Sequence, residues 1–176
     1  MRVRRFVLTG APGSGKTTLI DALRGRGHQV VAEAATDVIA RAHAAGVDEP
    51  WRDPAFITDI LALQRRREHA PGPAVRFHDR GPLCTVALAR HLGYAEPVVH
   101  TGGYERAVFL IEPLGFIERT AARRMAYADA VAFGVLHEQV YREHGCHLVR
   151  VPAGPVEQRV ALIEAVVSSD AAVPTR

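Results

Sequence analysis

The stretch FVLTGAPGSGKTTLIDAL, residues 6–23, decides the fold of this chain. It starts with an apolar segment of strand length, passes through a glycine-rich turn and continues with the apolar spacing of a helix from Lys16 to Leu23. The helix is expected to end at Gly25 and Gly27, because glycine readily adopts the left-handed conformation that often follows a last helical turn. A strand, a turn and a helix in this order predict the first unit of a parallel α/β sheet.

The glycine-rich turn fits a phosphate-binding pattern. Gly10, Gly15, Lys16 and Thr17 match G-x-x-x-x-G-K-[ST], with a strand before them and a helix after them. Glycines let successive backbone N–H groups face phosphate oxygens, and the helix adds the positive end of its dipole. We therefore expect Lys16 to bridge the terminal phosphates of a nucleotide and the Thr17 hydroxyl to ligate Mg²⁺. The expected nucleotide contacts in this turn are Gly10, Ala11, Pro12, Gly13, Ser14, Gly15, Lys16, Thr17 and Thr18.

Lys16 is the only lysine among 22 basic residues, and all the others are arginine. A compact ammonium is therefore expected to be needed in the turn, where the wider guanidinium fork would not fit. The net charge is +3, and the arginines are scattered without a basic stripe or interleaved aromatic residues, so nucleic acid is not expected as a partner. Binding of small phosphorylated ligands would equally explain the positive net charge of the chain.

Composition indicates a single globular domain. The chain has 176 residues, of which 48% are hydrophobic and 23% are charged, a balance typical of folded proteins. We assign residues 1–167 to one nucleotide-binding, kinase-like domain and residues 168–176 to a flexible C-terminal tail. No apolar run approaches the roughly 20 residues of a membrane span, so we expect a cytoplasmic protein without membrane contact. Cys84 and Cys146 lack the spacing of a metal site and are expected to be buried thiols.

The rest of the chain alternates apolar segments of strand length with longer segments of helical spacing. This alternation predicts a three-layer α/β fold of the P-loop NTPase type, in which helices cover both faces of a five-stranded parallel sheet. The expected strands are 5–9, 28–32, 74–78, 106–111 and 147–151. The expected helices after the first are 53–68, 82–92, 128–144 and 156–167.

The segment VRFHDRG, residues 75–81, places Asp79 at the carboxyl end of a predicted strand. A carboxylate there can hold the water shell of Mg²⁺; alternatively, Asp79 begins a turn or caps the helix that starts at Pro82. Many hydrolytic ATPases carry Glu after this Asp to polarise water, whereas this chain has Arg80. Transfer to another acceptor is therefore favoured over hydrolysis. A GTP switch is not expected, because the chain contains no asparagine for an N-K-x-D motif.

Together these motifs resemble those of small P-loop kinases of the nucleoside and nucleotide kinase group. The chain looks most similar to compact bacterial AAA-domain ATP-binding proteins related to the ribosylnicotinamide kinase domain. The resemblance rests on TGAPGSGKTTL, VVAEAA, DRG, VFLIEP, the segment 119–124, LHEQVYREHG and VRVPAGPVEQRV. It implies an ATP- and Mg²⁺-dependent phosphotransferase that moves the γ-phosphoryl group to the hydroxyl of a small molecule, with nucleoside-like molecules among the candidates. The alternatives are an antibiotic-modifying kinase and an ATP-binding or ATP-hydrolysing regulatory module that acts through a protein partner.

The resemblance also assigns residues to the acceptor side. Kinases of this group carry a carboxylate after the second strand as base for the substrate hydroxyl, and Glu33 occupies that position, although it could equally be a surface residue. Asp37, one helical turn later, is the second candidate. Arg80 matches an arginine near the acceptor and the phosphates, but Gly81 departs from the Ser or Tyr that often follows. Further expected contacts, of which the aromatic ones could instead belong to the core, are Trp51, Phe56 and Gln64.

Two further segments are assigned by the same resemblance. FIERTAARRMAYADA places Arg119 and Arg123 four residues apart on one helical face, like the arginine-bearing lid of these kinases. Lid arginines would stabilise the negative charge of the transferring phosphoryl group, and Arg119 would also contact the nucleotide; a solvated helix face is the alternative. Pro152 and Gly154 follow the last strand, where this group packs the adenine base, or they form only a turn. The oligomeric state is not assigned.

Overall fold

The computed structural model of the chain describes residues 3–69, 72–114 and 127–170. Within these residues one parallel sheet contains β1 (Arg4–Gly10), β2 (Gln29–Val31), β3 (Val75–Asp79), β4 (Ala107–Ile111) and β5 (His147–Val151). The order of these five strands across the sheet is β2-β3-β1-β4-β5. The predicted five-stranded parallel sheet is confirmed, and every strand overlaps its expected range.

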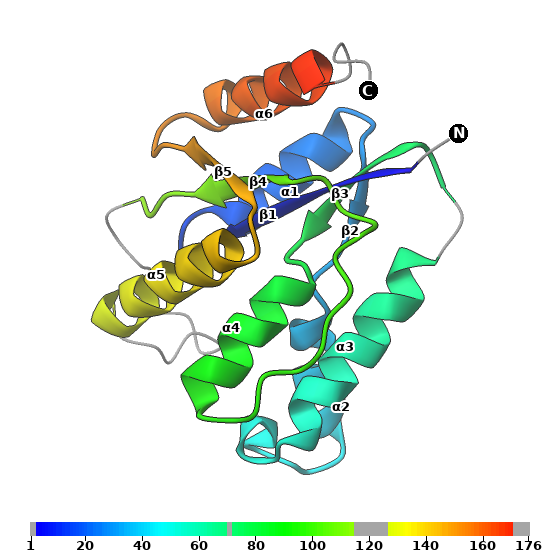
Figure 1. The fold of residues 1–176 in the computed structure, drawn as a ribbon, viewed down its shortest axis with the longest axis vertical. Helices are drawn as coiled ribbons and strands as arrows, with labels where there is room; N and C mark the ends of the chain where they lie inside the picture. Colours follow the sequence, from blue (N-terminus) through cyan, green and yellow to red (C-terminus); the bar gives the residue numbers. More distant parts are fainter. Residues whose placement is uncertain (1–2, 70–71, 115–126, 171–176) are drawn as a thin grey trace.

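Helices cover both faces of this sheet (Figure 1). α1 (Lys16–Gly25) and α6 (Val156–Asp170) pack together on one face, and α4 (Pro82–Leu92) and α5 (Tyr127–Glu143) pack together on the other. α2 (Ala34–Ala44) and α3 (Ala55–Glu68) form a pair next to α4, with the short 3-10 helix η1 (Pro50–Arg52) between them in sequence. This is the three-layer P-loop arrangement that the sequence predicts.

Alternate residues of β1 belong to two separate cores. Phe6 and Leu8 are fully buried against α1 and α6, together with Phe77 of β3 and Phe109 of β4. Val7 belongs to the opposite core, where it packs with residues of α4 and α5. This is the pattern of a strand that is covered on both faces. It fixes β1 in the middle of the molecule, with the glycine turn at its carboxyl end.

The strand order reverses its direction at the carboxyl end of β1. The chain crosses from β1 to β2 and β3 on one side and then to β4 on the other. In open α/β sheets, ligands bind where successive connections leave in opposite directions. The strand registers place Leu8 next to Asp79 and Gly10 next to Ile111. The predicted phosphate-binding turn and the predicted Mg²⁺ carboxylate therefore meet at one edge of the sheet.

The main difference from the predicted elements is α2, which the sequence analysis did not assign. Its sequence AATDVIARAHA is rich in alanine, a strong helix former, but only Ala34 and Val38 are buried, so its apolar pattern is short. α3 begins at Ala55 rather than at residue 53, because the Asp53 carboxylate accepts a hydrogen bond from the Ala55 N–H at 2.9 Å. None of the described helices has the length and apolar character that a bilayer span requires.

Candidate active site

The phosphate-binding turn connects β1 to α1. Gly10, Gly13 and Gly15 have φ angles of 143°, 80° and 76°, a region that favours glycine. A Cβ atom on Gly10 would lie 2.4 Å from the carbonyl oxygen of Ile111, so any larger residue would collide with β4. After the turn, the first N–H groups of α1 have no acceptor within the helix and lie at its positive end. The turn thus has the glycine-dependent backbone that a phosphate cradle requires.

Arg159 of α6 supports this turn from behind. Its Nη1 donates to the Ser14 carbonyl at 3.2 Å, and its Nη2 donates to the Glu112 carbonyl at 3.3 Å. The residue is only 4% exposed, and burial lowers the pKa of its guanidinium from the usual value despite the opposing attraction of Glu112. Sequence reasoning missed Arg159. An arginine inside the apolar stripe of Val156, Val160 and Ile163 is the signal that could have found it.

Lys16 and Asp79 form a buried ion pair beside the turn. The Lys16 Nζ lies 2.9 Å from the Asp79 Oδ1, and the two side chains are 9% and 11% exposed. Apart from this ion pair, the buried Asp79 oxygen has no hydrogen-bond partner among the described residues. An ion pair in this position can exchange its partners, so that Lys16 contacts phosphate oxygens and Asp79 contacts a cation.

The oxygen atoms near the turn suit Mg²⁺. Mg²⁺ usually takes one or two protein ligands and completes its shell with water and substrate phosphates. In the described part of the chain, no group of three or more His, Cys, Asp or Glu side chains is placed to enclose a metal. Asp79 offers a carboxylate at the sheet edge, and Thr17 is exposed in the first turn of α1. Both residues therefore fit the metal role that the sequence analysis gives them.

Arg80 links the sheet edge to the acceptor side. It has a φ of 69°, a conformation that costs a non-glycine residue about 1–3 kcal/mol. Its guanidinium Nε lies 2.6 Å from the Glu33 Oε1, and its Nη1 lies 2.9 Å from the His137 Nε2. Attraction between Arg80 and Glu33 raises the pKa of Arg80 although burial opposes the charge. These contacts hold the guanidinium in place and help to offset the backbone strain.

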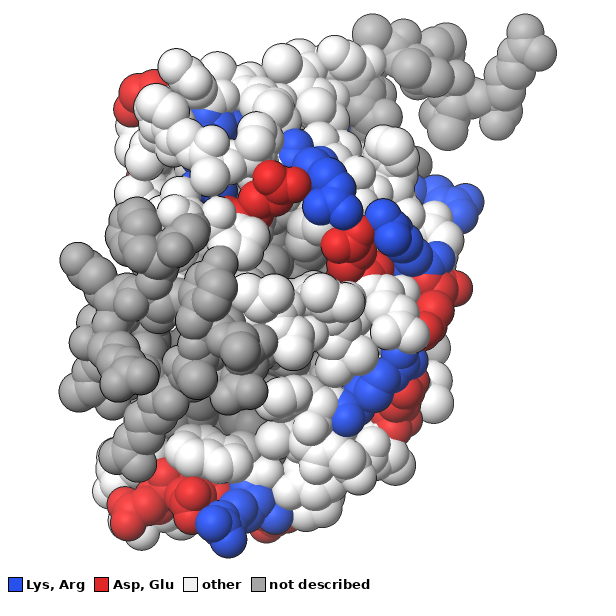
Figure 2. Space-filling view, turned by 90° about the vertical axis from the view of Figure 1, so that its left-hand side faces the viewer, with Lys and Arg blue, Asp and Glu red and all other residues white. Residues whose placement is uncertain are grey.

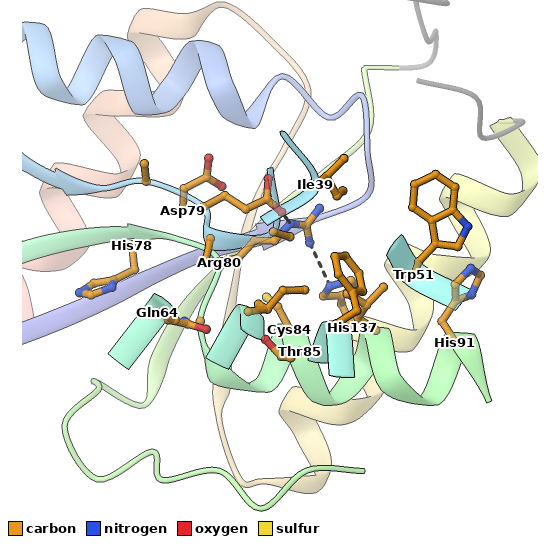
Figure 3. A pocket seen from close by; sticks show the side chains of 18 of the residues that line it. Ile39, Trp51, Gln64, His78, Asp79, Arg80, Cys84, Thr85, His91 and His137 are labelled. Atoms are coloured by element: carbon orange, nitrogen blue, oxygen red, sulfur yellow. Dashed lines mark hydrogen bonds and ion pairs between the residues drawn. The ribbon is translucent and has the colours of Figure 1, made fainter. Parts of the chain in front are cut away.

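His137 of α5 orients this arginine. Its side chain is fully buried. Because arginine can only donate, the His137 Nε2 must accept from Arg80, and its Nδ1 must carry the ring proton. That Nδ1 lies 2.8 Å from the Phe133 carbonyl, to which it donates. Glu33, Arg80 and His137 therefore form one row of polar contacts, of which Figure 3 shows the Arg80 to His137 contact as a dashed line.

The Glu33 carboxylate is held in its ionised form. Burial alone would raise its pKa, but the charges of Arg80 and Lys16 outweigh burial and lower the pKa below its usual value. The Thr36 hydroxyl adds a hydrogen bond to the Glu33 Oε2 at 3.1 Å. Glu33 therefore lies within electrostatic range of the lysine of the phosphate-binding turn. An ionised carboxylate in this place can accept the proton of a hydroxyl group.

A cavity of about 350 Å³ lies next to Glu33 and Arg80 (Figure 3). Its walls are mostly apolar and come from β2, β3, η1 and the helices α2, α3, α4 and α5. Asp79 also lines the cavity, which therefore reaches the edge where phosphates are expected. Asp37 is not part of the lining, and its carboxylate pairs with Arg67 instead. The predicted acceptor residues in the lining are Glu33, Trp51, Phe56, Gln64 and Arg80.

The remaining predicted residues lie outside the cavity. Pro152 and Gly154 are exposed in the connection between β5 and α6. That connection starts at the same edge of the parallel sheet as the phosphate-binding turn. Arg119 and Arg123 lie outside the described residues, so the lid stays a prediction.

Sequence reasoning also missed His78 and Cys84 as lining residues of the cavity. Burial and the charges of Arg5 and Arg76 lower the pKa of the His78 imidazole to about 4. The Cys84 Sγ lies 3.2 Å from the Tyr141 Oη. Burial alone would raise the pKa of this thiol, but His137 and Arg80 lower it to about 6. The sequence signals that could have found them are a polar residue, His78, within the buried strand β3 and a polar residue, Cys84, within the largely apolar helix α4.

Comparison with known proteins places the chain in a family. A family model described as AAA domain, AAA_28, matches residues 5–159. The chain belongs to this AAA domain family. The predicted membership is thereby confirmed, and the family match covers both the phosphate-binding turn and the cavity-lining residues. Among curated proteins, no sequence match to the chain was found.

Several solved structures have a similar fold. Deoxyadenosine kinase from M. mycoides is 10% identical with a TM-score of 0.62, and the alignment covers 94% of this chain and 99% of that one. Shikimate kinase from Acinetobacter baumannii is 14% identical with a TM-score of 0.64, covering 98% and 97%. Shikimate kinase from Aquifex aeolicus is 14% identical with a TM-score of 0.60, covering 96% and 98%. At such identities the likeness establishes the P-loop fold alone.

Surface charge is mixed on the face that Figure 2 shows. Basic and acidic side chains lie next to one another there, and no continuous basic stripe crosses the described part of this face. The absence of nucleic acid partners and the cytoplasmic location stay predictions.

Proposed function

We propose that this protein is a P-loop kinase that transfers the γ-phosphoryl group of MgATP to the hydroxyl of a small molecule. The observation that carries the proposal is the position of Glu33, which pairs with Arg80 at 2.6 Å in the wall of a cavity that also reaches Asp79. The fold that the chain shares with deoxyadenosine kinase and shikimate kinase adds support.

The phosphate-binding turn has the first role in the proposed reaction. Backbone N–H groups of residues 13–18 and the Lys16 ammonium bind the ATP phosphates and stabilise the charge that spreads over the γ-phosphoryl oxygens. Asp79 and Thr17 would hold Mg²⁺, which supplies further neutralisation of phosphate charge when bound. As the sequence resemblance implies, Pro152 and Gly154 would contact adenine, and Arg119 and Arg123 would close over the phosphates.

Glu33 takes the proton of the acceptor. As the acceptor oxygen forms its bond to the γ-phosphorus, the bond between that phosphorus and the bridging oxygen of ADP breaks. The hydroxyl proton passes to the Glu33 carboxylate late in this step. The products are ADP and the phosphate ester of the acceptor. Arg80 keeps Glu33 in position throughout, through the ion pair of 2.6 Å.

The cavity favours an uncharged, ring-bearing acceptor such as a nucleoside. Trp51, Phe56 and Phe133 supply aromatic walls. Among the described residues, Arg80 is the only arginine or lysine in the lining. Because Glu33 and His137 already engage Arg80, a carboxylate or phosphate on the acceptor would find no unpaired cation there. Such a site disfavours charged acceptors, since burial of an unpaired charge is costly.

An acceptor screen tests this function. ADP formation would be measured with ATP alone and then with each member of a panel of nucleosides, shikimate and hydroxylated antibiotics. We expect slow ADP formation with ATP alone and a clear increase with a nucleoside-like alcohol. Stimulation by a partner protein, with no response to any small molecule, would instead favour a regulatory ATPase. Stimulation only by an antibiotic would identify a drug-modifying kinase.

A further inference from the structure

Arg67, near the end of α3, differs from the two arginines that precede it. Arg65 and Arg66 are exposed, whereas the side chain of Arg67 is only 22% exposed. Its Nη1 donates to the carbonyl oxygen of Ala32 at 2.9 Å and to that of Glu33 at 2.7 Å. A guanidinium offers five N–H donors in a fixed planar arrangement. One nitrogen of Arg67 thus holds two consecutive carbonyl groups of the main chain.

These two carbonyls belong to the connection between β2 and α2. β2 ends at Val31 and α2 begins at Ala34, so the connection consists of Ala32 and Glu33 alone. β2 has three residues and lies at the edge of the sheet, where it pairs with β3. A short edge strand gives the residues that follow it little support from the sheet. Arg67 supplies a hydrogen bond to each residue of this connection.

Asp37 fixes the orientation of the Arg67 guanidinium. The Nη2 of Arg67 donates to the Asp37 carboxylate, which lies in the first turn of α2. An ion pair to a planar guanidinium restricts its direction as well as its position. Asparagine at position 37 would keep an oxygen that accepts from Nη2, so Asp37→Asn is expected to leave the Arg67 contacts in place.

Glu33 is therefore held at two places. Its carboxylate pairs with Arg80 at 2.6 Å, and its main-chain carbonyl accepts from Arg67 at 2.7 Å. Arg67 follows Gln64 by one turn of α3, and Gln64 lines the same cavity as Glu33. Arg67 itself is not part of the lining. It thus connects the α3 wall of the cavity to the residue that carries the proposed base.

We propose that Arg67 is a positioning residue for phosphoryl transfer, which fixes the main chain of Glu33 relative to the α3 wall against which the acceptor binds. This inference rests on the proposed kinase function and extends it to a residue that touches neither the acceptor nor the phosphates. A base must lie within hydrogen-bond reach of the hydroxyl proton, and a misplacement of about 1 Å can lower a rate by about 100-fold. Arg67 acts on the rate through the place of Glu33.

The first test measures the local structure without substrates. Arg67→Met keeps an unbranched side chain and removes all the N–H donors. Amide hydrogen exchange at residues 37–40, whose N–H groups bond to the first carbonyls of α2, is expected to be about tenfold faster than in the wild type. Arg66→Met is the matched control, because it removes the same charge from an exposed neighbour, and it should leave this exchange unchanged.

The exchange of β1 amides separates positioning from general stability. These amides are expected to exchange at the wild-type rate in Arg67→Met under conditions that favour the native state. Unchanged exchange at residues 37–40 would overturn the inference. An equal increase in β1 and at residues 37–40 would also overturn it, because it would show that Arg67 stabilises the whole domain and not this connection.

The second test measures kinetics with the best acceptor from the screen, well below the melting temperature of each variant. In Arg67→Met, kcat is expected to fall by about tenfold or more, while KM for ATP changes less than twofold. Arg67→Lys keeps a cationic donor and should recover part of the lost kcat, and Arg66→Met should keep the wild-type kcat. An unchanged kcat in Arg67→Met overturns the inference while the kinase function stands. Failure of the wild type to phosphorylate any acceptor contradicts the kinase function, and the inference falls with it.

Discussion

The phosphate side and the acceptor side of this site are built in different ways. The phosphate side is the continuous run of residues 10–18, and its geometry depends on backbone conformations that favour glycine. The acceptor cavity collects side chains from two strands, η1 and four helices, and its polar groups are few. The phosphate-binding backbone needs the correct conformation along the whole turn. The lining of the cavity, in contrast, can change by substitution of a single side chain. If the proposed function holds, donor binding is set by the fold and acceptor choice is set by individual side chains.

The largest effect is expected at the phosphate side. Lys16→Ala removes the ammonium that stabilises phosphate charge, so transfer should fall by about 1000-fold, and stabilisation by ATP in a thermal shift assay should disappear. Lys16→Arg keeps the charge but widens the head group, and it should also lose most activity. Unchanged thermal stabilisation by ATP in Lys16→Ala would refute the role given to this residue.

Glu33→Gln is expected to affect the acceptor side of the site without affecting ATP binding on the phosphate side. The amide cannot accept the hydroxyl proton, so kcat should fall by about 100-fold or more, while ATP still stabilises the protein in a thermal shift assay. Asp37→Asn is the matched control, because Asp37 is paired with Arg67 and does not line the cavity. If Asp37→Asn lost activity and Glu33→Gln kept it, the base would have to be reassigned to Asp37.

Arg159→Met tests the support behind the turn. Loss of its hydrogen bond to the Ser14 carbonyl, the one that reaches the turn, should raise KM for ATP about tenfold, as expected for one charged hydrogen bond. The KM for the acceptor should change little, since Arg159 does not line the cavity. Arg159→Lys should give an intermediate value. Equal increases in both KM values would mean that the residue acts only through general stability.

The smallest effect is a pH dependence of stability at Glu33. Its pKa in the folded protein is lowered from the usual 4.5. A lowered carboxyl pKa contributes stability that is present above the unfolded pKa and is lost as pH falls through the folded value. Urea unfolding of wild type and Glu33→Gln at pH 7 and at pH 3 should therefore give a larger difference in unfolding free energy at pH 7. A larger difference at pH 3 would contradict the assigned direction.

The fold was predictable because its signals are local. The turn from Gly10 to Thr17 is read directly from neighbouring residues, and the strands of the central sheet are short apolar runs between helical segments. α2 was missed because its burial is limited to Ala34 and Val38, which leaves too little apolar periodicity. The P-loop fold could thus be predicted without knowing any tertiary contact.

The acceptor side was predictable only in part, because its residues meet through tertiary packing. Resemblance predicted that Glu33 and Arg80 lie at one site, as the cavity lining has them, but nothing in the sequence indicates that His137, 57 residues after Arg80, contacts its guanidinium. The unsatisfied nitrogens of His78 are likewise visible only once the surrounding side chains are placed. Burial of a polar residue depends on every element packed against it, and that information is not local.

The most direct test of the account follows the γ-phosphoryl group itself. ATP labelled in this group would be incubated with the protein and the best acceptor from the screen, and the label would be traced by mass spectrometry. The account expects the label on the organic phosphate ester, in amounts equal to the ADP formed. Appearance of all the label as inorganic phosphate, at a rate that the acceptor does not change, would contradict it.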